Sequence, residues 1–254
     1  MSLLEARGLD IEVGSRCLCR GLDLRLEPGQ CWALLGRNGA GKTSLLHTLA
    51  GLRPARGGEI SLDGRPLARL GRRQIARRLG LMFQDSADPF PASVLETALL
   101  GRHPHLGGWG REDAEQVELA RRALTQVGLE AFEQRPVASL SGGERRRLAL
   151  ASLLTQDPRM ALLDEPVNHL DLPQQQRQLH LLRARCEQGK GVLMVLHDVN
   201  LALRFCTHLL LLYGDGRHDQ GPLEQVAGRE RLERLYGHPL VELQGPRGRL
   251  MVPA

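Results

Sequence analysis

A glycine-rich loop constrains this chain more than any other feature. The segment Gly36-Arg37-Asn38-Gly39-Ala40-Gly41-Lys42-Thr43 fits the pattern G-x-x-x-x-G-K-[ST]; it follows the apolar run Cys31–Leu35 and opens a helix predicted over Lys42–Ala50. Glycines let backbone N–H groups turn inward around a chain of phosphates, and the start of a helix adds the positive end of its dipole. The sequence therefore predicts a phosphate-binding loop between a buried parallel strand and a helix, within an α/β fold.

The side chains of this loop suit ATP with Mg²⁺. Lys42 would reach the β- and γ-phosphates, the hydroxyl of Thr43 would ligate Mg²⁺, and Ser44 is placed to contact an inner phosphate. Only Lys42 and Lys190 are lysines among the 34 basic residues, which indicates that the chemistry at position 42 requires an ammonium group. The alternative is a glycine-rich turn that merely links two elements. The residues expected to hold the nucleotide here are Gly36, Asn38, Gly39, Ala40, Gly41, Lys42, Thr43 and Ser44.

Two acids follow a second apolar run. In Ala161-Leu162-Leu163-Asp164-Glu165, an aspartate ends a predicted strand and a glutamate comes next. An aspartate at the carboxyl end of a strand near a phosphate loop can hold Mg²⁺, and the neighbouring glutamate can activate the attacking water. Alone, such a pair usually indicates a polar loop. Together with the phosphate loop, it predicts Asp164 as a metal ligand and Glu165 as the general base.

A third motif predicts another anion-binding helix start. Leu140-Ser141-Gly142-Gly143-Glu144 places a capping serine before two glycines, whose N–H groups would be exposed at the first turn. Taken alone, this motif is more typical of an ordinary capped helix.

Helical patterns dominate the middle of the chain, from about residue 93 to residue 155. The predicted helices there are Val94–Leu100, Ala114–Val127 and Glu144–Leu154. Because the flanking segments read mainly as strands, we expect a mixed, mainly parallel sheet with a helical subdomain inserted into it.

The core is expected to consist of residues 1–92 and 156–254 within a single domain. Met160–Leu163 and Val192–Leu196 are buried-strand runs joined by a helix predicted at Gln174–Cys186. Two last strands, Leu240–Leu243 and Arg249–Val252, flank a proline-glycine turn.

Composition narrows the possible functions. No run approaches the roughly 20 apolar residues of a membrane span, and the first residues lack a secretory signal pattern, so any membrane role should be peripheral. The net charge of +5 is scattered and only 3% of residues are aromatic, which argues against nucleic acid as a partner. Five cysteines without a C-x-x-C pair indicate free thiols in a reducing cytosol.

The ordered set of motifs resembles the ATP-binding-cassette (ABC) ATPases, which have a P-loop NTPase core, and the resemblance runs over nearly the whole chain. The phosphate loop comes first, followed in order by Gln84 after a strand, LSGGE at 140–144, LLDEP at 162–166, Asp171, and His197 at the end of a strand.

This resemblance implies a head-to-tail homodimer that holds ATP between its subunits. Ser141 and Gly143 of one subunit would contact the γ-phosphate bound on the phosphate loop of the other, and Asp171 would span the interface. Gln84 would sense Mg²⁺ and the attacking water and link to the membrane subunits, and His197 would hold the γ-phosphate. The implied catalytic set is Glu165, His197, Gln84 and Lys42, and the implied metal set is Thr43, Gln84 and Asp164.

One position departs from the family pattern. The family often stacks adenine on an aromatic ring before the first strand of the phosphate loop, whereas this chain offers Val13. Base recognition is therefore expected to rest on apolar contact, with weak discrimination between ATP and GTP.

Within the family, the chain resembles the ATPases of importers for iron-siderophores, haem and cobalamin. The hints are Gly101-Arg102-His103-Pro104-His105, His197-Asp198-Val199-Asn200-Leu201-Ala202 and the closing strand pair. The implied partners are integral membrane permease subunits and, indirectly, a substrate-binding protein, at the cytoplasmic face of the inner or plasma membrane. The alternatives are an importer subunit for another cargo such as molybdate, a soluble ABC ATPase acting on DNA or ribosomes, and a catalytically inactive interaction module.

Overall fold

The computed structural model describes residues 2–14, 16–84, 91–106, 114–245 and 248–254. The described residues within 1–70 and 182–254 form one compact unit, unit 1, and those within 71–181 form another, unit 2. No helix in the described ranges is both long and apolar enough to cross a bilayer.

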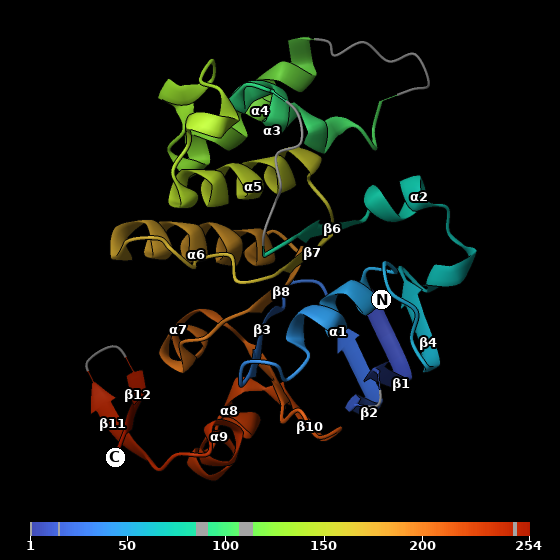
Figure 1. Cartoon of the computed structure of the whole chain (residues 1–254), viewed down its shortest axis with the longest axis vertical. Helices are drawn as coiled ribbons and strands as arrows, with labels where there is room; N and C mark the ends of the chain where they lie inside the picture. Colours follow the sequence, from blue (N-terminus) through green and yellow to red (C-terminus); the bar gives the residue numbers. More distant parts are fainter. Residues whose placement is uncertain (1, 15, 85–90, 107–113, 246–247) are drawn as a thin grey trace. The chain divides into compact units, whose positions relative to one another are not determined.

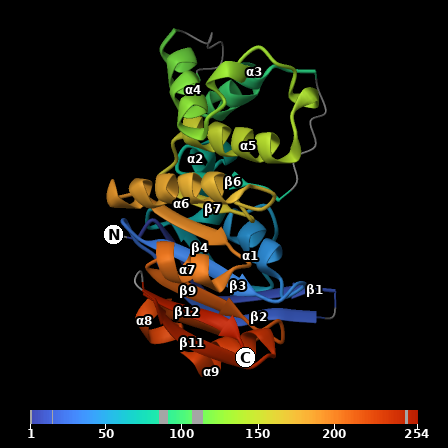
Figure 2. The ribbon, with the colours of Figure 1, turned by 90° about the vertical axis from the view of Figure 1, so that its left-hand side faces the viewer.

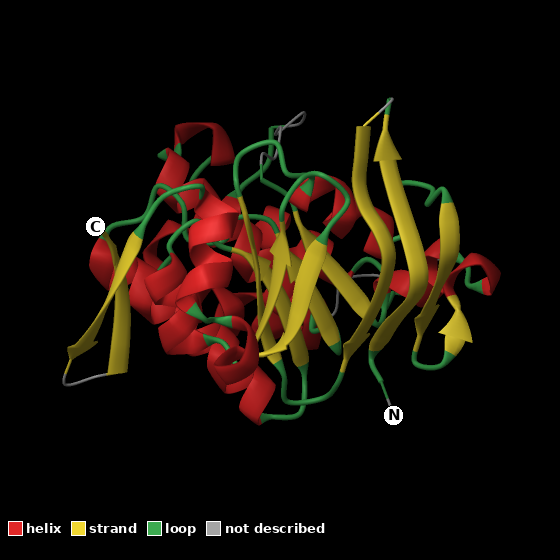
Figure 3. Cartoon of the chain, turned by 90° about the horizontal axis from the view of Figure 1, so that it is seen from below, coloured by secondary structure: helices red, strands yellow, loops and turns green. Residues whose placement is uncertain are grey.

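Unit 1 contains an antiparallel sheet with the strand order β2-β1-β4-β5. Its strands are among those drawn in yellow in Figure 3. Strand β2 alternates strictly near its end, where Leu22, Leu24 and Leu26 are buried while Asp23 and Arg25 are exposed. This period of two is that of a sheet with one face on the core. The strands of this sheet are β1 (Leu4–Val13), β2 (Arg16–Leu26), β4 (Gly57–Leu62) and β5 (Arg65–Pro66).

A group of parallel strands carries the phosphate loop of unit 1. Strand β3 (Cys31–Gly36) pairs in parallel with β8 (Gly191–Val195) and β9 (His208–Leu212), and β10 (His218–Pro222) pairs antiparallel with β9. Every residue of β3 and β8 is buried, which explains why both read as continuous apolar runs. The phosphate loop follows β3 and leads into α1 (Lys42–Leu49).

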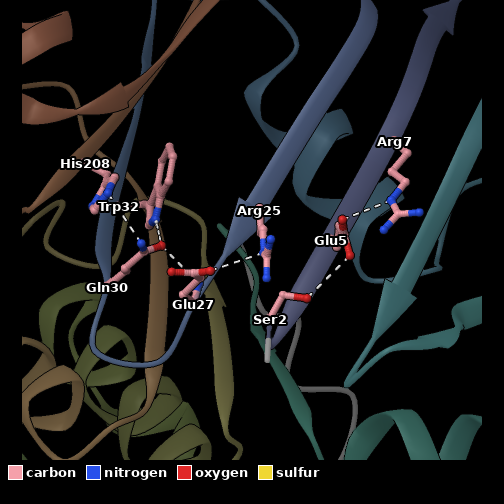
Figure 4. Close-up of polar contacts among 8 residues, drawn as sticks. All are labelled: Ser2, Glu5, Arg7, Arg25, Glu27, Gln30, Trp32 and His208. Atoms are coloured by element: carbon pink, nitrogen blue, oxygen red, sulfur yellow. Dashed lines mark hydrogen bonds and ion pairs between the residues drawn. The ribbon is translucent and has the colours of Figure 1, made fainter.

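Gln30 anchors the other end of β3 (Figure 4). Its Oε1 accepts hydrogen bonds from the backbone N–H of Glu27 at 3.0 Å and from Nε1 of Trp32 at 2.8 Å. Its Nε2 lies 3.4 Å from Nε2 of His208, whose ring stacks on Trp32 with centroids 4.6 Å apart. Because Trp32 and His208 are also register partners, these contacts fix how β3 and β9 align, and hence where the phosphate loop begins.

The rest of unit 1 is helical except for a closing hairpin. Helix α7 (Val199–Phe205) is tied to the hairpin by Asn200, which donates to the carbonyl of Met251 at 3.0 Å and accepts from its N–H at 2.8 Å. The orange α7 and the red hairpin strands can be followed in Figure 1. The remaining elements are α8 (Leu223–Val226), α9 (Arg229–Tyr236), β11 (Leu240–Gly245) and β12 (Gly248–Pro253).

Unit 2 combines a parallel strand pair with three packed helices (Figure 2). Helix α4 is amphipathic: its buried residues Ala120, Ala123, Leu124 and Val127 follow helical spacing and so lie on one face. The elements of this unit are α2 (Arg72–Ala76), β6 (Leu79–Met82), α3 (Val94–Leu99), α4 (Ala114–Val127), α5 (Gly142–Gln156), β7 (Met160–Leu163) and the first part of α6 (Leu172–Glu187).

The three helices predicted between residues 93 and 155 are confirmed as α3, α4 and α5. Unit 2 extends beyond that interval because Gln156 ties the end of α5 to the strand pair. Its Nε2 donates to the carbonyls of Ala76 at 2.6 Å and Leu79 at 3.2 Å. The division into a core and an inserted subdomain at residues 93 and 155 stays a prediction. Helix α7 and strand β10 were not expected from the sequence.

Candidate nucleotide-binding and catalytic site

The phosphate loop of unit 1 encloses the ammonium group of Lys42. Nζ donates to the carbonyls of Gly36 at 2.8 Å and Arg37 at 3.1 Å, and the residue is 7% exposed. Arg37 lies within the loop and Gly36 at its start, so the cation is held inside the curve of the backbone. A cation held there can bind the phosphates that the loop's N–H groups would surround.

Two glycines of this loop could not be replaced without displacing their neighbours. A Cβ on Gly36 would lie 2.7 Å from the carbonyl oxygen of Leu212, and one on Gly41 would lie 2.7 Å from Cδ1 of Leu18. Gly41 also caps α1 with a φ of 99°, in the left-handed region that favours glycine. The loop backbone is therefore shaped as a cradle without side chains at these positions, which fits a bound polyphosphate.

The hydroxyls expected near the phosphates stand in the first turn of α1. Thr43 and Ser44 are half-buried, and Nη1 of Arg53 lies 3.5 Å from Oγ of Ser44. A threonine hydroxyl at this position is a hard oxygen donor of the kind Mg²⁺ prefers. The residues of unit 1 thus fit an ATP-binding site with a metal-ligating hydroxyl.

His197 lies at the same sheet edge as the phosphate loop. It follows the carboxyl end of β8, which pairs in parallel with β3, and its side chain is exposed. Because neighbouring parallel strands end at one edge, His197 is positioned to face a ligand held on the loop. Its predicted contact with the γ-phosphate stays a prediction.

In unit 2, two amide side chains converge on Glu165. Nε2 of Gln84 donates to Oε2 of Glu165 at 3.1 Å, and Nδ2 of Asn168 donates to the same oxygen. Glu165 adopts a φ of 53°, which is uncommon for a residue with a side chain, and Asp164 beside it is 1% exposed. The predicted metal ligands Gln84 and Asp164 and the predicted base Glu165 therefore follow two paired strands, β6 and β7, at one sheet edge.

Asn168 was missed as a functional residue by sequence reasoning. In sequence it is one residue of the stretch after LLDEP, and no pattern there predicts a role for it. An asparagine in a loop is unremarkable in sequence. Its backbone N–H bonds to the carbonyl of Glu165 at 3.2 Å, which closes a turn and brings its amide back to the glutamate. The signal lies in the turn geometry and not in the residue type.

The predicted cap of the third motif is confirmed. Ser141 precedes α5: its Oγ accepts from the N–H of Glu144 at 3.3 Å, and its own N–H donates to Oε2 of Glu144 at 2.7 Å. These bonds hold the pKa of Glu144 below its ordinary value. A hydroxyl that accepts this bond still has its own proton to donate to an anion, so Ser141 can serve both as a cap and as a phosphate contact.

The start of α5 lies close to the loop that contains Asp171. A Cβ on Gly143 would lie 3.1 Å from the carbonyl oxygen of His169, which has a φ of 62°. Asp171 is exposed, and its Oδ1 accepts from the N–H of Gln174 at 2.9 Å as α6 begins. The start of α5 thus lies against the backbone two residues before Asp171, and the predicted interface role of Ser141, Gly143 and Asp171 stays a prediction.

The structure places Val13 at the turn end of the β1–β2 hairpin. Val13 is 38% exposed and pairs across the hairpin with Arg16. Nε and Nη2 of Arg16 donate to the carbonyl of Gly214 at 3.2 and 3.0 Å, and its Nη1 would lie 3.8 Å from a Cβ on Gly39. An arginine beside the phosphate loop was not predicted, although a guanidinium plane can stack on a base in place of an aromatic ring.

Comparison with known proteins identifies the family. The sequence model described as "ABC transporter" matches residues 19–168. The chain is 37% identical to the Streptomyces coelicolor "Hemin import ATP-binding protein HmuV" over 98% of this chain and 89% of that protein. It is 34% identical to the Bacillus subtilis "Iron(3+)-hydroxamate import ATP-binding protein FhuC", covering 93% of this chain and 88% of that protein.

Solved structures agree with this assignment. A chain from a structure described as an inward-facing metal-chelate type ABC transporter superimposes with a TM-score of 0.87 at 26% identity, over 100% of this chain and 98% of that chain. A nucleotide-free ATP-binding cassette superimposes with a TM-score of 0.77 at 20% identity, over 94% of this chain and 96% of that one, and supports the fold alone. The predicted α/β fold with a mixed, mainly parallel sheet and a helical subdomain is confirmed. The chain belongs to the ABC transporter family, as an ATP-binding subunit with ATPase activity.

Proposed function

We propose that this chain hydrolyses ATP to drive import of a metal chelate of the iron-siderophore or haem kind. The observation that carries the ATPase mechanism is the carboxylate of Glu165, held by the amides of Gln84 and Asn168. The cargo class is supported by full-length similarity to relatives described as hemin and iron(3+)-hydroxamate import proteins.

In this mechanism the phosphate loop binds ATP, and Glu165 acts on water. Lys42 and the loop N–H groups neutralise and orient the β- and γ-phosphates. The water oxygen forms a bond to the γ-phosphorus, the bond from that phosphorus to the bridging oxygen of ADP breaks, and Glu165 accepts the proton. His197 would hold the γ-phosphate in line.

Mg²⁺ fits the oxygen donors of this chain. Thr43 offers a hydroxyl, Gln84 an amide oxygen and Asp164 a buried carboxylate, all of which are hard ligands. When bound, Mg²⁺ would neutralise the charge that develops on the phosphates. Asp164 would supply the negative charge that holds the ion, and Thr43 and Gln84 would complete its shell together with water and phosphate.

A second copy of the chain would complete the site. Ser141 and Gly143 sit at the start of α5, next to the loop that carries Asp171. We infer that this surface of one subunit contacts the γ-phosphate held by the other, so that two ATP molecules are enclosed between two subunits.

The permease would contact unit 2. A cavity of about 550 Å³ lies in this unit beside Gln84, lined by Phe83, Thr97, Val137, Arg145 and Ser152 among others. Phe83 is 41% exposed there, so an apolar side chain is available to a partner. Because Gln84 also contacts Glu165, a partner seated in this cavity would act on the residue that hydrolyses ATP. The subunit would then work at the cytoplasmic face of the membrane, with a substrate-binding protein on the other side.

The test is reconstitution with a candidate permease and binding protein. The chain should copurify with the permease, and vesicles should take up a ferric hydroxamate or haem only with Mg-ATP inside and an intact Glu165. Uptake of molybdate instead would replace the proposed cargo. Failure to associate with any permease, together with ATPase stimulation by DNA or ribosomes, would favour the soluble alternative.

A further inference from the structure

Arg146 is a nearly buried arginine that donates hydrogen bonds to the backbone of the catalytic loops of unit 2. It lies on α5, five residues after the capping Ser141, and is 8% exposed. Burial of a guanidinium is costly unless its donors are satisfied, because the group stays charged. Its partners therefore reveal what the side chain holds in place.

The guanidinium donates to backbone carbonyls on two loops. Nη1 donates to the carbonyls of Phe83 at 2.7 Å and Gln84 at 2.6 Å. Nε donates to the carbonyl of Glu165 at 2.9 Å, and Nη2 donates to the carbonyls of Asp164 and Glu165. Phe83 and Gln84 follow β6, and Asp164 and Glu165 follow β7. One planar guanidinium thus joins the backbones of the two loops that carry Gln84 and Glu165, whose side chains are hydrogen-bonded to each other.

This arrangement connects the capped end of α5 to the carboxylate of Glu165. Five residues of helix span about 7.5 Å, and the hydrogen-bonded backbone between Ser141 and Arg146 moves as one piece. A shift of α5 would move the guanidinium and, with it, the main chain of Gln84 and Glu165. A displacement of about 1 Å at a reacting group can cost about 100-fold in rate.

We propose that Arg146 is a positioning residue, which transmits the placement of α5 to the catalytic carboxylate of Glu165. The Ser141 end of α5 is the expected contact for a phosphate bound to the partner subunit. Through Arg146, the position of this helix sets the position of the main chain at Gln84 and Glu165. The inference rests on the proposed function, because it assumes that Glu165 is the base. Arg146 itself would touch neither ATP nor water.

The test compares Arg146→Lys with the matched control Arg147→Lys. Arg147 is on the same helix and also donates to backbone carbonyls, those of Val127 at 3.1 Å and Gly128 at 2.7 Å, but these lie away from the catalytic loops. A lysine at 146 keeps the charge but has no planar fork to serve four carbonyls.

For the full chain with Mg-ATP, we expect Arg146→Lys to lower kcat by about 10- to 100-fold. The ATP dissociation constant should stay within about threefold, since the expected nucleotide ligands of the phosphate loop are unchanged. Arg147→Lys should leave kcat within about twofold. Equal kcat values in the two variants would overturn the proposal. So would a loss of kcat in Arg146→Lys that is fully explained by a lower Tm of that variant.

A double substitution separates this inference from the base assignment. If Arg146 acts through Glu165, Arg146→Lys should cause little further loss in a Glu165→Gln background; an additive loss would overturn the proposal. Arg146→Gln, which keeps two donors, replaces the lysine variant if that variant does not fold. Full turnover in Glu165→Gln would instead refute the proposed base, whatever Arg146→Lys does.

Discussion

Nε2 of Gln84 donates a 3.1 Å hydrogen bond to Oε2 of Glu165, from the loop after β6 to the loop after β7. Asn168 donates to the same oxygen, so one carboxylate oxygen is oriented from both loops. Under the proposed function, a partner that moves Gln84 would change how the carboxylate of Glu165 is held, and would thereby link a bound permease to ATP hydrolysis.

Asn168→Ala should slow hydrolysis without weakening ATP binding. A hydrogen bond to a charged group contributes about 1.5–3 kcal/mol, so removal of one of the two donors should reduce kcat by roughly tenfold or more. Single-turnover ATPase measurements test this. Asn200→Ala is a control, because among the described residues the side chain of Asn200 bonds only to the backbone of Met251. Wild-type turnover in Asn168→Ala would show that this donor does not matter.

Glu165→Gln should trap a nucleotide-held dimer. Glutamine keeps the shape of the side chain but cannot accept a proton, so hydrolysis should fall by about 10²- to 10⁴-fold while binding survives. Size-exclusion chromatography with Mg-ATP should show the dimer. If the isolated subunits dimerise too weakly, the same measurement is made on the assembled transporter. Ser141→Arg in the same background should abolish it by filling the partner's phosphate site. A dimer that tolerates Ser141→Arg would contradict the composite site.

Lys42→Ala should weaken ATP binding through the loss of a charge-assisted bond of about 1.5–3 kcal/mol, or roughly 10- to 150-fold in affinity. Equilibrium binding of a fluorescent ATP analogue is the measurement. Lys190→Ala is the matched control, since it removes the other lysine of the chain. Unchanged affinity in Lys42→Ala would rule out this loop as the nucleotide site.

Val13→Tyr should tighten ATP binding. Base–aromatic stacking contributes about 1–3 kcal/mol, and Val13 stands exposed at the hairpin end where a ring could lie against a base. The wild-type chain should discriminate only weakly between ATP and GTP. Competition binding with both nucleotides checks this; equal or weaker ATP affinity in Val13→Tyr would mean that the base lies elsewhere.

Stability should fall as the pH drops from 7 to 5.5. Burial lowers the pKa values of His105, His208 and His218, so the folded chain binds fewer protons than the unfolded chain below the ordinary histidine pKa of about 6.5. Unfolding then takes up protons, and the free energy of unfolding rises with pH in this window. Carboxylates with lowered pKa values, such as Glu96 and Glu144, change the pH dependence of stability only below about pH 4.5. They therefore do not contribute to the slope between pH 5.5 and 7.

Denaturant unfolding at pH 5.5, 6.5 and 7.5 measures this slope. His208→Gln should reduce it, because glutamine can still bond to Thr207 and Gln30 but does not titrate. A slope that is the same in His208→Gln would exclude this histidine as a source of the pH dependence.

Local sequence patterns predict the phosphate loop, the acidic strand end and the helical middle of the chain. These depend on local rules. Gly41 adopts a left-handed backbone that residues with side chains rarely adopt, and continuous apolar runs such as β3 are typical of buried parallel strands. Ser141 with Glu144 forms a capping box four residues long. Each pattern is complete within a few neighbouring residues, so it can be read without knowing the fold.

Which of these residues meet depends on how the chain folds. Gln84 and Glu165 are 81 positions apart in sequence and touch because β6 and β7 pair in parallel with ends at one edge. Arg146 reads in sequence as the middle of three consecutive arginines on a solvated helix, yet it is buried against carbonyls from two distant loops. A backbone carbonyl is present at every position and carries no sequence signal, so contacts of this kind appear only when the chain is folded.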